Sequence, residues 1–398
     1  MSENNSTPEN TTAFDPTKAY FAPAPEPRTA LGRHRQLSPL AGVHVSPLAL
    51  RGLSLGEAWS SFGAGEQTRA NCFALLDAFF DAGGNFIDTA NSYQNGESEE
   101  ITGEWMEKRG NREQMIVATK YTGHWNRGKD IQQRTHCVGS NVKSLQVSVD
   151  ASLKKLRTSY IDILYVHDWD FTAGVPEVMN GLHHLVAQGK VLYLGISNAP
   201  AWVVTEANTY AKLTAKTPFS IYQGAWSILQ RDFEREIIPM ARAHGLALSP
   251  WNVLEGGKIR TDAEEEAKKQ SQEKRRSLFF GNPDWQRTPE ERRVCQALEK
   301  VAKQVGAKSI RAVAIAYLMQ KTAYVFPIIG ARKVEQLMEN LEALEIILSG
   351  EQIRYLESIL SFDVGFPNKL IGNGTAYSFE HLTAAQFDRW PMQQAIRP

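Results

Sequence analysis

The sequence predicts a (β/α)8 barrel of the TIM-barrel class, and two features of its hydrophobic pattern carry this prediction. Short apolar runs alternate with longer amphipathic runs along most of the chain, which is the pattern of repeated strand–helix units. The short runs, such as VLYLGI at 191–196, are apolar at nearly every position, as parallel strands covered on both faces are. Because the chain holds eight such units, a closed barrel fits the pattern better than an open sheet.

The predicted elements follow one another in a regular order. Residues 1–28 are polar and rich in Asn, Thr, Pro and Glu, so we expect a disordered tail, and residues 36–45 form a predicted hairpin. The eight predicted strands lie at 48–53, 85–89, 115–120, 161–167, 191–197, 220–223, 247–251 and 325–329. The predicted helices between them include 70–82, 97–108, 141–156, 176–188, 201–212, 233–244 and 333–341.

Two stretches interrupt this order, one within the predicted barrel domain at 29–365 and one after it. A long, charged insertion at 254–287 follows the seventh predicted strand. It fits a solvated helix or mobile loop, and it also fits a flap over a bound cofactor, so both interpretations stay open. At its end, TPEE at 288–291 predicts a helix start, with Thr at the N-cap, Pro at the first position and Glu at the third. The second stretch is a C-terminal extension at 366–398.

Composition excludes several classes of function. Lys plus Arg and Asp plus Glu each number 44 among 398 residues, so net charge gives no reason to expect a nucleic acid or an anionic membrane as partner. The three cysteines, Cys72, Cys137 and Cys295, have no CxxC spacing, which argues against a disulfide framework or a zinc site. We find no secretory signal and no apolar stretch of about 20 residues. A cytoplasmic protein is therefore expected.

Four side chains with acid–base chemistry lie where predicted strands end. Asp88 and Tyr93 follow the second strand, Lys120 ends the third and His167 ends the fourth. In such a barrel the carboxyl ends of the strands meet at one mouth, where catalytic groups lie. A free phenol has a pKa near ~10, and an ammonium held by a carboxylate would lower that pKa. Asp88, Lys120 and Tyr93 therefore predict a proton donor at Tyr93, with His167 orienting a carbonyl oxygen and no metal required.

Each of these residues also has an ordinary structural interpretation. A single Asp at a strand end is often a capping residue, a loop Tyr often packs, a Lys is often on the surface and a His is often a core residue. Their occurrence together at the ends of three successive strands favours the catalytic interpretation.

The chain resembles the aldo-keto reductase superfamily in three segments: GNFIDTANSY at 84–93, VATK at 117–120 and YVH at 165–167. The resemblance covers roughly residues 31–360. TALGRHR at 29–35 and GEWM at 103–106 resemble the fungal aryl-alcohol dehydrogenases and norsolorinic acid reductase-like proteins. The resemblance implies reversible NADPH-dependent reduction of an aromatic or polyketide-type aldehyde or ketone. It implies a catalytic tetrad of Asp88, Tyr93, Lys120 and His167.

The resemblance also implies where the cofactor binds. Ser197, Asn198 and Gln223 match the positions that hold the carboxamide of nicotinamide, and Trp251 matches the aromatic residue that stacks on its ring. Arg332 suits a 2′-phosphate, which favours NADP over NAD. The full set of implied contacts is Gly52, Leu53, Asp88, Ser197, Asn198, Gln223, Trp251, Asn252, Leu254, Gly330, Ala331, Arg332, Gln336, Glu339 and Asn340. Gln223 and Trp251 also fit purely structural roles.

Two residues depart from the family pattern, and three others suggest the nature of the substrate. Relatives often carry small residues at the end of the first strand, where this chain has Arg51, and Asp168 follows His167 where an aromatic residue is common. The predicted substrate pocket is lined by Trp125, Trp169 and Trp226, and such indole walls suit flat aromatic carbonyl compounds. Ordinary packing explains these tryptophans equally well.

Two other functions remain alternatives. Barrels of this superfamily also serve as NADPH-binding regulatory subunits with little turnover. A metal-dependent hydrolase using Asp88 and His167 is a weaker alternative, which metal analysis would separate, since we expect no metal at a stoichiometric level. The natural substrate and the oligomeric state are left open by the sequence.

Overall fold

Eight parallel strands form the centre of the protein, in a computed structural model that describes residues 20–60, 67–128, 130–270 and 286–398. In the sheet, β10 is followed by β3 and then by the strands in chain order to β9. A parallel bridge between Leu248 and Val325 brings the two edges together. The strands are β3 (Ala49–Arg51), β4 (Phe86–Asp88), β5 (Ile116–Tyr121), β6 (Ile161–Val166), β7 (Val191–Ser197), β8 (Phe219–Ala225), β9 (Ala247–Trp251) and β10 (Ile328–Ile329). The predicted (β/α)8 barrel is confirmed.

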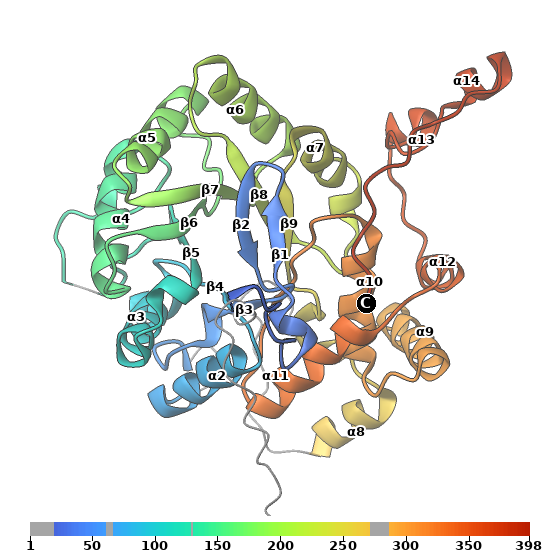
Figure 1. The fold of residues 1–398 in the computed structure, drawn as a ribbon, viewed down its shortest axis with the longest axis horizontal. Helices are drawn as coiled ribbons and strands as arrows, with labels where there is room; N and C mark the ends of the chain where they lie inside the picture. The colour runs from blue at the N-terminus through green and yellow to red at the C-terminus, as the bar shows by residue number, and fades with distance from the viewer. Residues whose placement is uncertain (1–19, 61–66, 129, 271–285) are drawn as a thin grey trace, which may run out of the picture.

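Helices surround this barrel, as Figure 1 shows. Those that follow the strands are α2 (Arg69–Asp81), α3 (Glu97–Arg109), α4 (Val142–Lys155), α5 (Val175–Ala187), α6 (Ala201–Leu213), α7 (Ile237–His244), α9 (Pro289–Val305), α10 (Ile310–Lys321) and α11 (Val334–Leu341). Thr288 caps α9 in a capping box with Glu291, as the sequence predicts. The sequence pattern did not reveal α10, because this helix is buried on almost all sides and has no polar face to mark its period.

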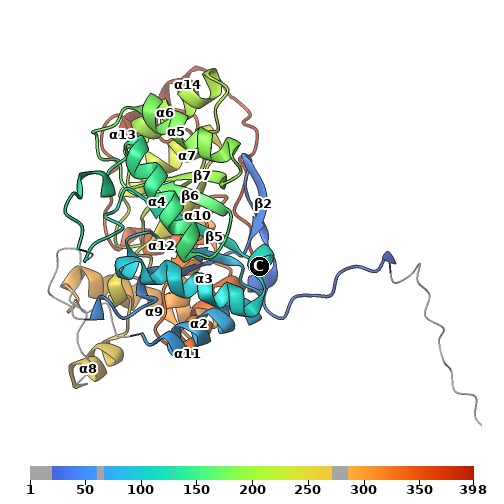
Figure 2. The same cartoon turned by 90° about the vertical axis from the view of Figure 1, so that its left-hand side faces the viewer.

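The hairpin of β1 (Arg35–Ser38) and β2 (Ala41–Val45) closes the end of the barrel where the strands begin. Its buried Leu37, Ala41 and Val45 join inward-facing strand residues such as Ala49 and Ala118 in one apolar cluster. Figure 2 shows the hairpin on one side of the barrel and α8 (Asp262–Gln270) toward the other. The carboxyl ends of the strands therefore open on the face opposite the hairpin.

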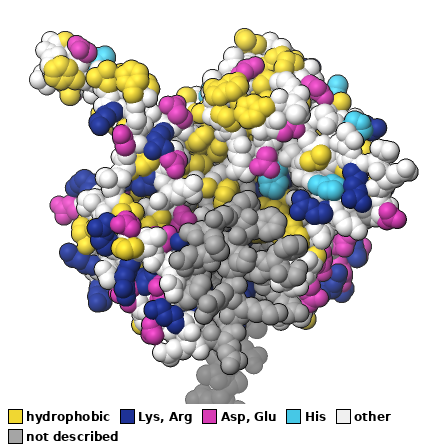
Figure 3. Space-filling view, turned by 180° about the vertical axis from the view of Figure 1, so that it is seen from behind, with side chains coloured by type: hydrophobic (Ala, Val, Ile, Leu, Met, Phe, Trp, Pro, Cys, Tyr) yellow, Lys and Arg dark blue, Asp and Glu magenta, His cyan; other side chains and the backbone are white. Residues whose placement is uncertain are grey.

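The predicted insertion and extension lie outside the eight strand–helix units. α8 belongs to the insertion, and its Glu264 and Glu265 pair with arginines outside the helix. After α12 (Gly350–Ser358), the extension carries α13 (Asn368–Ile371) and α14 (Phe379–Ala384) away from the barrel (Figure 1). Hydrophobic side chains cover much of this arm, which stands clear of the body in Figure 3. In the described ranges, no helix has the length and apolar character needed to span a bilayer.

Most of the predicted N-terminal tail, residues 1–19, lies outside the described residues, as do residues 271–285 of the insertion. The described residues 22–28 contain no helix or strand. The predicted boundaries of the barrel domain at 29 and 365 stay predictions.

Candidate active site

An ion pair between Lys120 and Asp88 lies at the carboxyl end of the barrel interior. The Nζ atom of Lys120 donates to Oδ2 of Asp88 and to the backbone carbonyl of Thr89, both at 2.7 Å. The other carboxylate oxygen of Asp88 accepts a hydrogen bond from Nε2 of Gln223 at 2.8 Å. Both charged side chains are almost completely buried, so the pair sits in a low-dielectric environment that strengthens its attraction.

Strand geometry explains why these side chains meet. Side chains alternate between the two faces of a strand, and Ala118 points into the barrel, so Lys120 two residues later does the same. Phe86 and Asp88 on β4 follow the same rule. The predicted convergence of Asp88 and Lys120 at the barrel mouth therefore follows from their positions at the ends of neighbouring strands.

Tyr93 lies beside this pair, on the loop that follows β4. Its ring centroid is 5.0 Å from Nζ of Lys120 and 5.7 Å from the imidazole centroid of His167. The loop is tied to the neighbouring strand where the backbone amide of Asn91 donates to the carbonyl of Lys120 at 3.1 Å. Trp59 contacts the same tyrosine edge-on, with ring centroids 6.4 Å apart. The four residues of the predicted tetrad thus occur in one cluster.

Opposing effects act on the acidity of Tyr93. Burial raises the pKa of its phenol above the ordinary value, and the negative charge of Asp88 acts in the same direction. The positive charges of Lys120 and Arg51 lower this pKa, and hydrogen bonding to Lys120 adds to their effect. Lys120 acts in the direction expected from the sequence, but burial is the larger effect. The phenol therefore keeps its proton at neutral pH, and the two cations favour its release when charge develops nearby.

His167 is neutral in this site. Burial lowers the pKa of its imidazole to about 4, and the nearby charge of Lys120 adds to this effect, while Asp168 opposes it. Its Nδ1 atom is buried and has no hydrogen-bond partner in the described part of the chain. A neutral imidazole can donate one hydrogen bond to a carbonyl oxygen but holds no second proton to release at pH 7.

The predicted nicotinamide contacts lie on β7, β8 and β9 beside the ion pair. Ser197, which ends β7, is buried, and its hydroxyl makes no hydrogen bond to any described residue. Asn198 donates to the carboxylate of Asp168 at 2.9 Å and accepts from the indole of Trp251 at 3.4 Å. Gln223 holds Asp88, which gives this residue a structural role in addition to the predicted one.

The remaining predicted cofactor residues lie around the ends of β3, β9 and β10. The backbone amide of Arg332 donates to the side chain of Gln336 at 3.0 Å, which organises the loop before α11. Glu339 pairs with Arg311 at 3.0 Å, and Asn340 is buried. The other members of the set occupy the strand ends or the loops that follow them, namely Gly52, Leu53, Asn252, Leu254, Gly330 and Ala331.

The three tryptophans of the predicted pocket occupy different environments. Trp125 and Trp169 are half-buried in the loops after β5 and β6. Trp226 is fully buried, and its ring stacks on Phe233 with centroids 5.4 Å apart, inside the hydrophobic core. This position does not fit a substrate wall, because a side chain closed in by core residues presents no surface to a ligand. Trp226 is therefore left out of the proposed pocket.

Two contributors to this site were not predicted from the sequence. Trp59 contacts Tyr93, and the sequence offers no signal for this because the residue lies in a loop far from its partner in the chain. Glu99 is completely buried on α3, where it accepts a hydrogen bond from Thr119 at 2.6 Å and pairs with Lys155 at 2.5 Å. A Glu in the first turn of a helix resembles an ordinary surface residue, so its burial became evident only in the structure.

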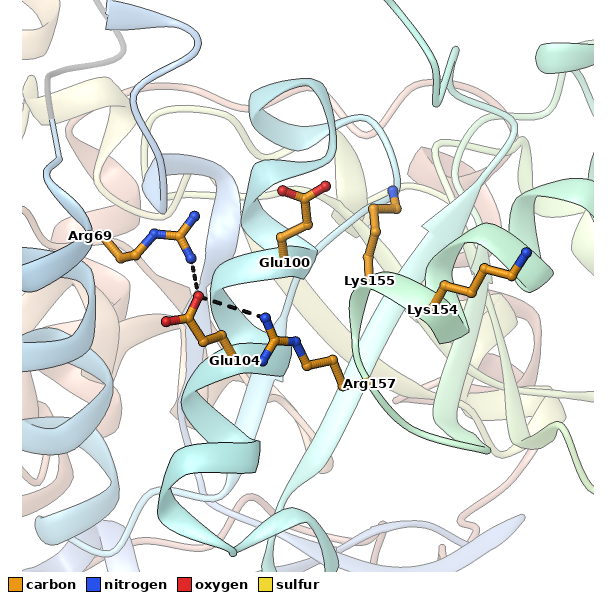
Figure 4. A pocket seen from close by; sticks show the side chains of 6 residues that line it. All are labelled: Arg69, Glu100, Glu104, Lys154, Lys155 and Arg157. Atoms are coloured by element: carbon orange, nitrogen blue, oxygen red, sulfur yellow. Dashed lines mark hydrogen bonds and ion pairs between the residues drawn. The ribbon is translucent and has the colours of Figure 1, made fainter.

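A surface hollow lies outside the barrel, next to this buried glutamate. Arg69 and Arg157 both reach Glu104 there, so much of its charge is internally paired (Figure 4). Lys155 also borders the hollow and donates to the backbone carbonyl of Asn91 at 3.2 Å. The hollow is therefore a solvated ionic surface behind the Tyr93 loop. Among the described residues, no cluster of three or more His, Cys, Asp or Glu side chains could hold a metal ion.

Comparison with known proteins agrees with this geometry. The sequence profile of the Aldo/keto reductase family matches residues 52–361, which is most of the chain and contains the whole cluster. The chain belongs to the aldo/keto reductase family.

Individual members of the family are similar along nearly their whole length. The chain is 59% identical over 383 residues to an aryl-alcohol dehydrogenase [NADP(+)] of Phanerodontia chrysosporium, covering 95% of this chain and 99% of the relative. It is 53% identical over 361 residues to a putative aryl-alcohol dehydrogenase of Saccharomyces cerevisiae, covering 89% and 94%. It is 46% identical over 386 residues to norsolorinic acid reductase A of Aspergillus parasiticus, covering 94% and 96%.

Proposed function

We propose that this aldo/keto reductase uses NADPH to reduce an aromatic or polyketide-type aldehyde or ketone to its alcohol, with Tyr93 as the proton donor. The observation that carries the proposal is the position of the Lys120 ammonium, which is bonded to Asp88 and lies 5.0 Å from the ring centroid of Tyr93. The names of the relatives support the aromatic substrate class and the choice of NADP. The half-buried Trp125 and Trp169 near the mouth offer flat surfaces for such a substrate.

The residues of the site fit a dinucleotide on two observations. The hydroxyl of Ser197 is buried without a partner among the described residues, as expected of a group that binds a ligand. Gly330 is exposed at the end of β10, and an added Cβ atom there would meet only the side chain of Arg51, at an ordinary contact distance of 3.4 Å, so a ligand can approach this backbone closely. The carboxamide of the nicotinamide would be held by Ser197, Asn198 and Gln223. Its ring would stack on Trp251, and the segment 330–340 would bind the phosphates of the adenosine half.

The residues of the site have separate roles in the proposed reduction. When bound, NADPH would supply the hydride that reduces the carbonyl carbon. His167 orients the carbonyl by donating a hydrogen bond to its oxygen, because its lowered pKa keeps the imidazole neutral. Tyr93 gives its proton to the same oxygen, and the cations at Lys120 and Arg51 stabilise the phenolate that remains. The alcohol product carries the transferred hydride and the proton of Tyr93.

Replacing the phenol tests this assignment directly. We expect Tyr93→Phe to lower kcat for an aromatic aldehyde by about 100-fold or more, since it removes the general acid, while NADPH affinity changes little. Stopped-flow or steady-state loss of NADPH absorbance measures turnover, and fluorescence titration measures affinity.

The matched control is Tyr121→Phe. Tyr121 is the next residue after Lys120, so its side chain lies on the outer face of the barrel, in the core against the helices, and its hydroxyl donates to the carbonyl of Ser140 at 3.4 Å. This variant should keep turnover within about twofold. Unchanged turnover in Tyr93→Phe would remove Tyr93 from the acid role. Tight NADPH binding by the unmodified chain without turnover on a broad panel of carbonyl compounds would instead favour a regulatory subunit.

A further inference from the structure

Arg51 is a cation in the barrel interior to which the proposed chemistry assigns only an electrostatic effect on Tyr93. It ends β3, two residues after Ala49, and Ala49 belongs to the apolar cluster inside the barrel. Because strand side chains alternate, Arg51 also points inward. Its register partner on β4 is Asp88, so the two side chains start from the same level of the barrel, and Arg51 interacts electrostatically with both Asp88 and Tyr93.

The charge of Arg51 has no counter-ion of its own. Both oxygens of Asp88 are already occupied, one by Lys120 and the other by Gln223. Within the described ranges, Arg51 forms no hydrogen bond and no ion pair, and burial lowers the pKa of its guanidinium group. His167 is neutral and contributes no charge at pH 7. Arg51 is therefore a half-buried cation without a direct ion-pair partner among the described residues, and a partly desolvated cation is stabilised when a ligand supplies an anion.

The position of the side chain indicates which part of a ligand it meets. β10 is the neighbour of β3 in the sheet, and Gly330 directly follows β10. The Cδ atom of Arg51 lies 3.4 Å from the place that a Cβ atom on Gly330 would occupy. The Arg51 side chain thus extends over Gly330, the first residue of the loop 330–332. In the sheet, Asp88 on β4 lies between Arg51 on β3 and Lys120 on β5, so Arg51 and Lys120 are on opposite sides of it.

We propose that Arg51 binds the diphosphate of the dinucleotide. A guanidinium group presents paired N–H donors that match two phosphate oxygens, and the contact would give the Arg51 side chain an anionic partner. The inference rests on the proposed function, because it requires that a dinucleotide binds. The inference adds a charged contact from β3 to the phosphate contacts that are already expected from the loop after β10. Arg51 would then contribute to cofactor affinity.

Binding measurements with cofactor fragments test this contact without measuring turnover. NADPH and 2′-phospho-ADP-ribose contain the diphosphate, whereas 2′-AMP contains only the 2′-phosphate. We expect Arg51→Met to weaken the first two by about 10- to 100-fold and to change 2′-AMP affinity by less than about twofold. Arg51→Lys should recover part of the loss, since it restores the charge but not the paired donors. Fluorescence titration and calorimetry measure these affinities.

The control is Arg35→Met. Arg35 is a half-buried arginine on β1 at the opposite end of the barrel, and burial also lowers its pKa. This variant should bind all three ligands as the unmodified chain does. Thermal unfolding without ligand shows whether Arg51→Met is folded, and we expect it to be at least as stable as the unmodified chain because an unpaired charge is gone.

Three outcomes would overturn the inference, and they are distinguishable. If the unmodified chain does not bind NADPH, the proposed function fails and the inference fails with it. If the unmodified chain binds NADPH and Arg51→Met binds it equally or more tightly, the proposed function stands and the diphosphate contact is wrong. If affinity for 2′-AMP falls as much as that for NADPH, Arg51 acts on the 2′-phosphate or on the whole site rather than on the diphosphate.

Discussion

At the scale of single residues, the active site depends on which charges have partners. Lys120 and Asp88 neutralise each other at 2.7 Å, so neither has a net effect far from the pair. Arg51 is the additional cation, and it lowers the pKa of Tyr93 together with Lys120. The phenol is thus buried enough to stay protonated and close enough to positive charge to lose its proton in the proposed reduction.

The neutral state of His167 makes the stability of the protein depend on pH. An unfolded histidine has a pKa of about 6.5, whereas the folded pKa is about 4. Between these values the unfolded chain binds more protons, so stability falls as the pH falls from about 6.5 to 4. We expect His167→Gln to reduce this acid sensitivity, measured as the change in urea midpoint between pH 7 and pH 5. The exposed His136→Gln serves as control and should keep the full sensitivity. Equal pH dependence in all three proteins would contradict a neutral His167 with a lowered pKa.

Residue types and spacing were enough to predict that Asp88, Tyr93, Lys120 and His167 lie in one cluster, but not the electrostatics of that cluster. Asp88, Lys120 and His167 could be placed because they end or directly follow predicted strands, and parallel strands end at one mouth. The balance of effects on Tyr93 could not be predicted, because burial depends on neighbours such as Trp59 that are distant in the sequence. Trp226 was wrongly assigned to the substrate pocket, because the sequence does not distinguish a tryptophan that faces the core after a strand from one that faces the mouth.

At the scale of elements, a buried network outside the barrel holds the Tyr93 loop in place. Glu99 on α3 contacts Thr119, the neighbour of Lys120, and pairs with Lys155 on α4. Lys155 in turn donates to the carbonyl of Asn91, two residues before Tyr93. The network therefore links two helices, the end of β5 and the loop that carries the proposed acid.

Breaking this network should affect stability and turnover together. Lys155→Met leaves Glu99 buried and unpaired, so we expect a loss of about 3 kcal/mol or more in the free energy of unfolding, together with a lower kcat. The double variant Glu99→Met with Lys155→Met should recover much of the stability, because no charge remains buried alone. Urea denaturation measures both variants, with Lys154→Met on the same helix as the control. A Lys155→Met protein as stable as the unmodified chain would show that the pair contributes little.

The order of the elements was predictable because most barrel strands carry an apolar run and most helices carry a polar face. The pattern fails where this contrast disappears. α10 has buried residues from Ala312 to Gln320 on every side, so its composition does not distinguish a helix from a buried strand. The last strand is also shorter than predicted, since only Ile328 and Ile329 of the predicted 325–329 pair as a strand.

At the scale of the whole molecule, the C-terminal extension is separate from the chemistry. It begins after the segment that matches the family profile, which ends at residue 361. Its last residues touch the barrel where the strands begin, through Gln393 to the hydroxyl of Tyr324 at 2.8 Å and Arg397 to the carbonyl of Leu348 at 3.0 Å. Many of its large apolar side chains, including Phe366 and Trp390, are exposed.

Removing the extension should therefore leave the active site intact. We expect a chain that ends at Gly365 to bind NADPH within about twofold of the full chain, because the hydrogen bonds of the extension to the rest of the chain go to Arg235, Glu236, Arg242, Tyr324 and Leu348, none of which belongs to the proposed cofactor site. The few lost hydrogen bonds should lower the free energy of unfolding by only about 1–3 kcal/mol, and fewer exposed apolar side chains should raise the concentration at which the protein precipitates. Titration, thermal unfolding and light scattering measure the three quantities. If the shortened chain folds but binds NADPH much more weakly, the extension contributes to the cofactor site, and the predicted boundary at residue 365 is wrong.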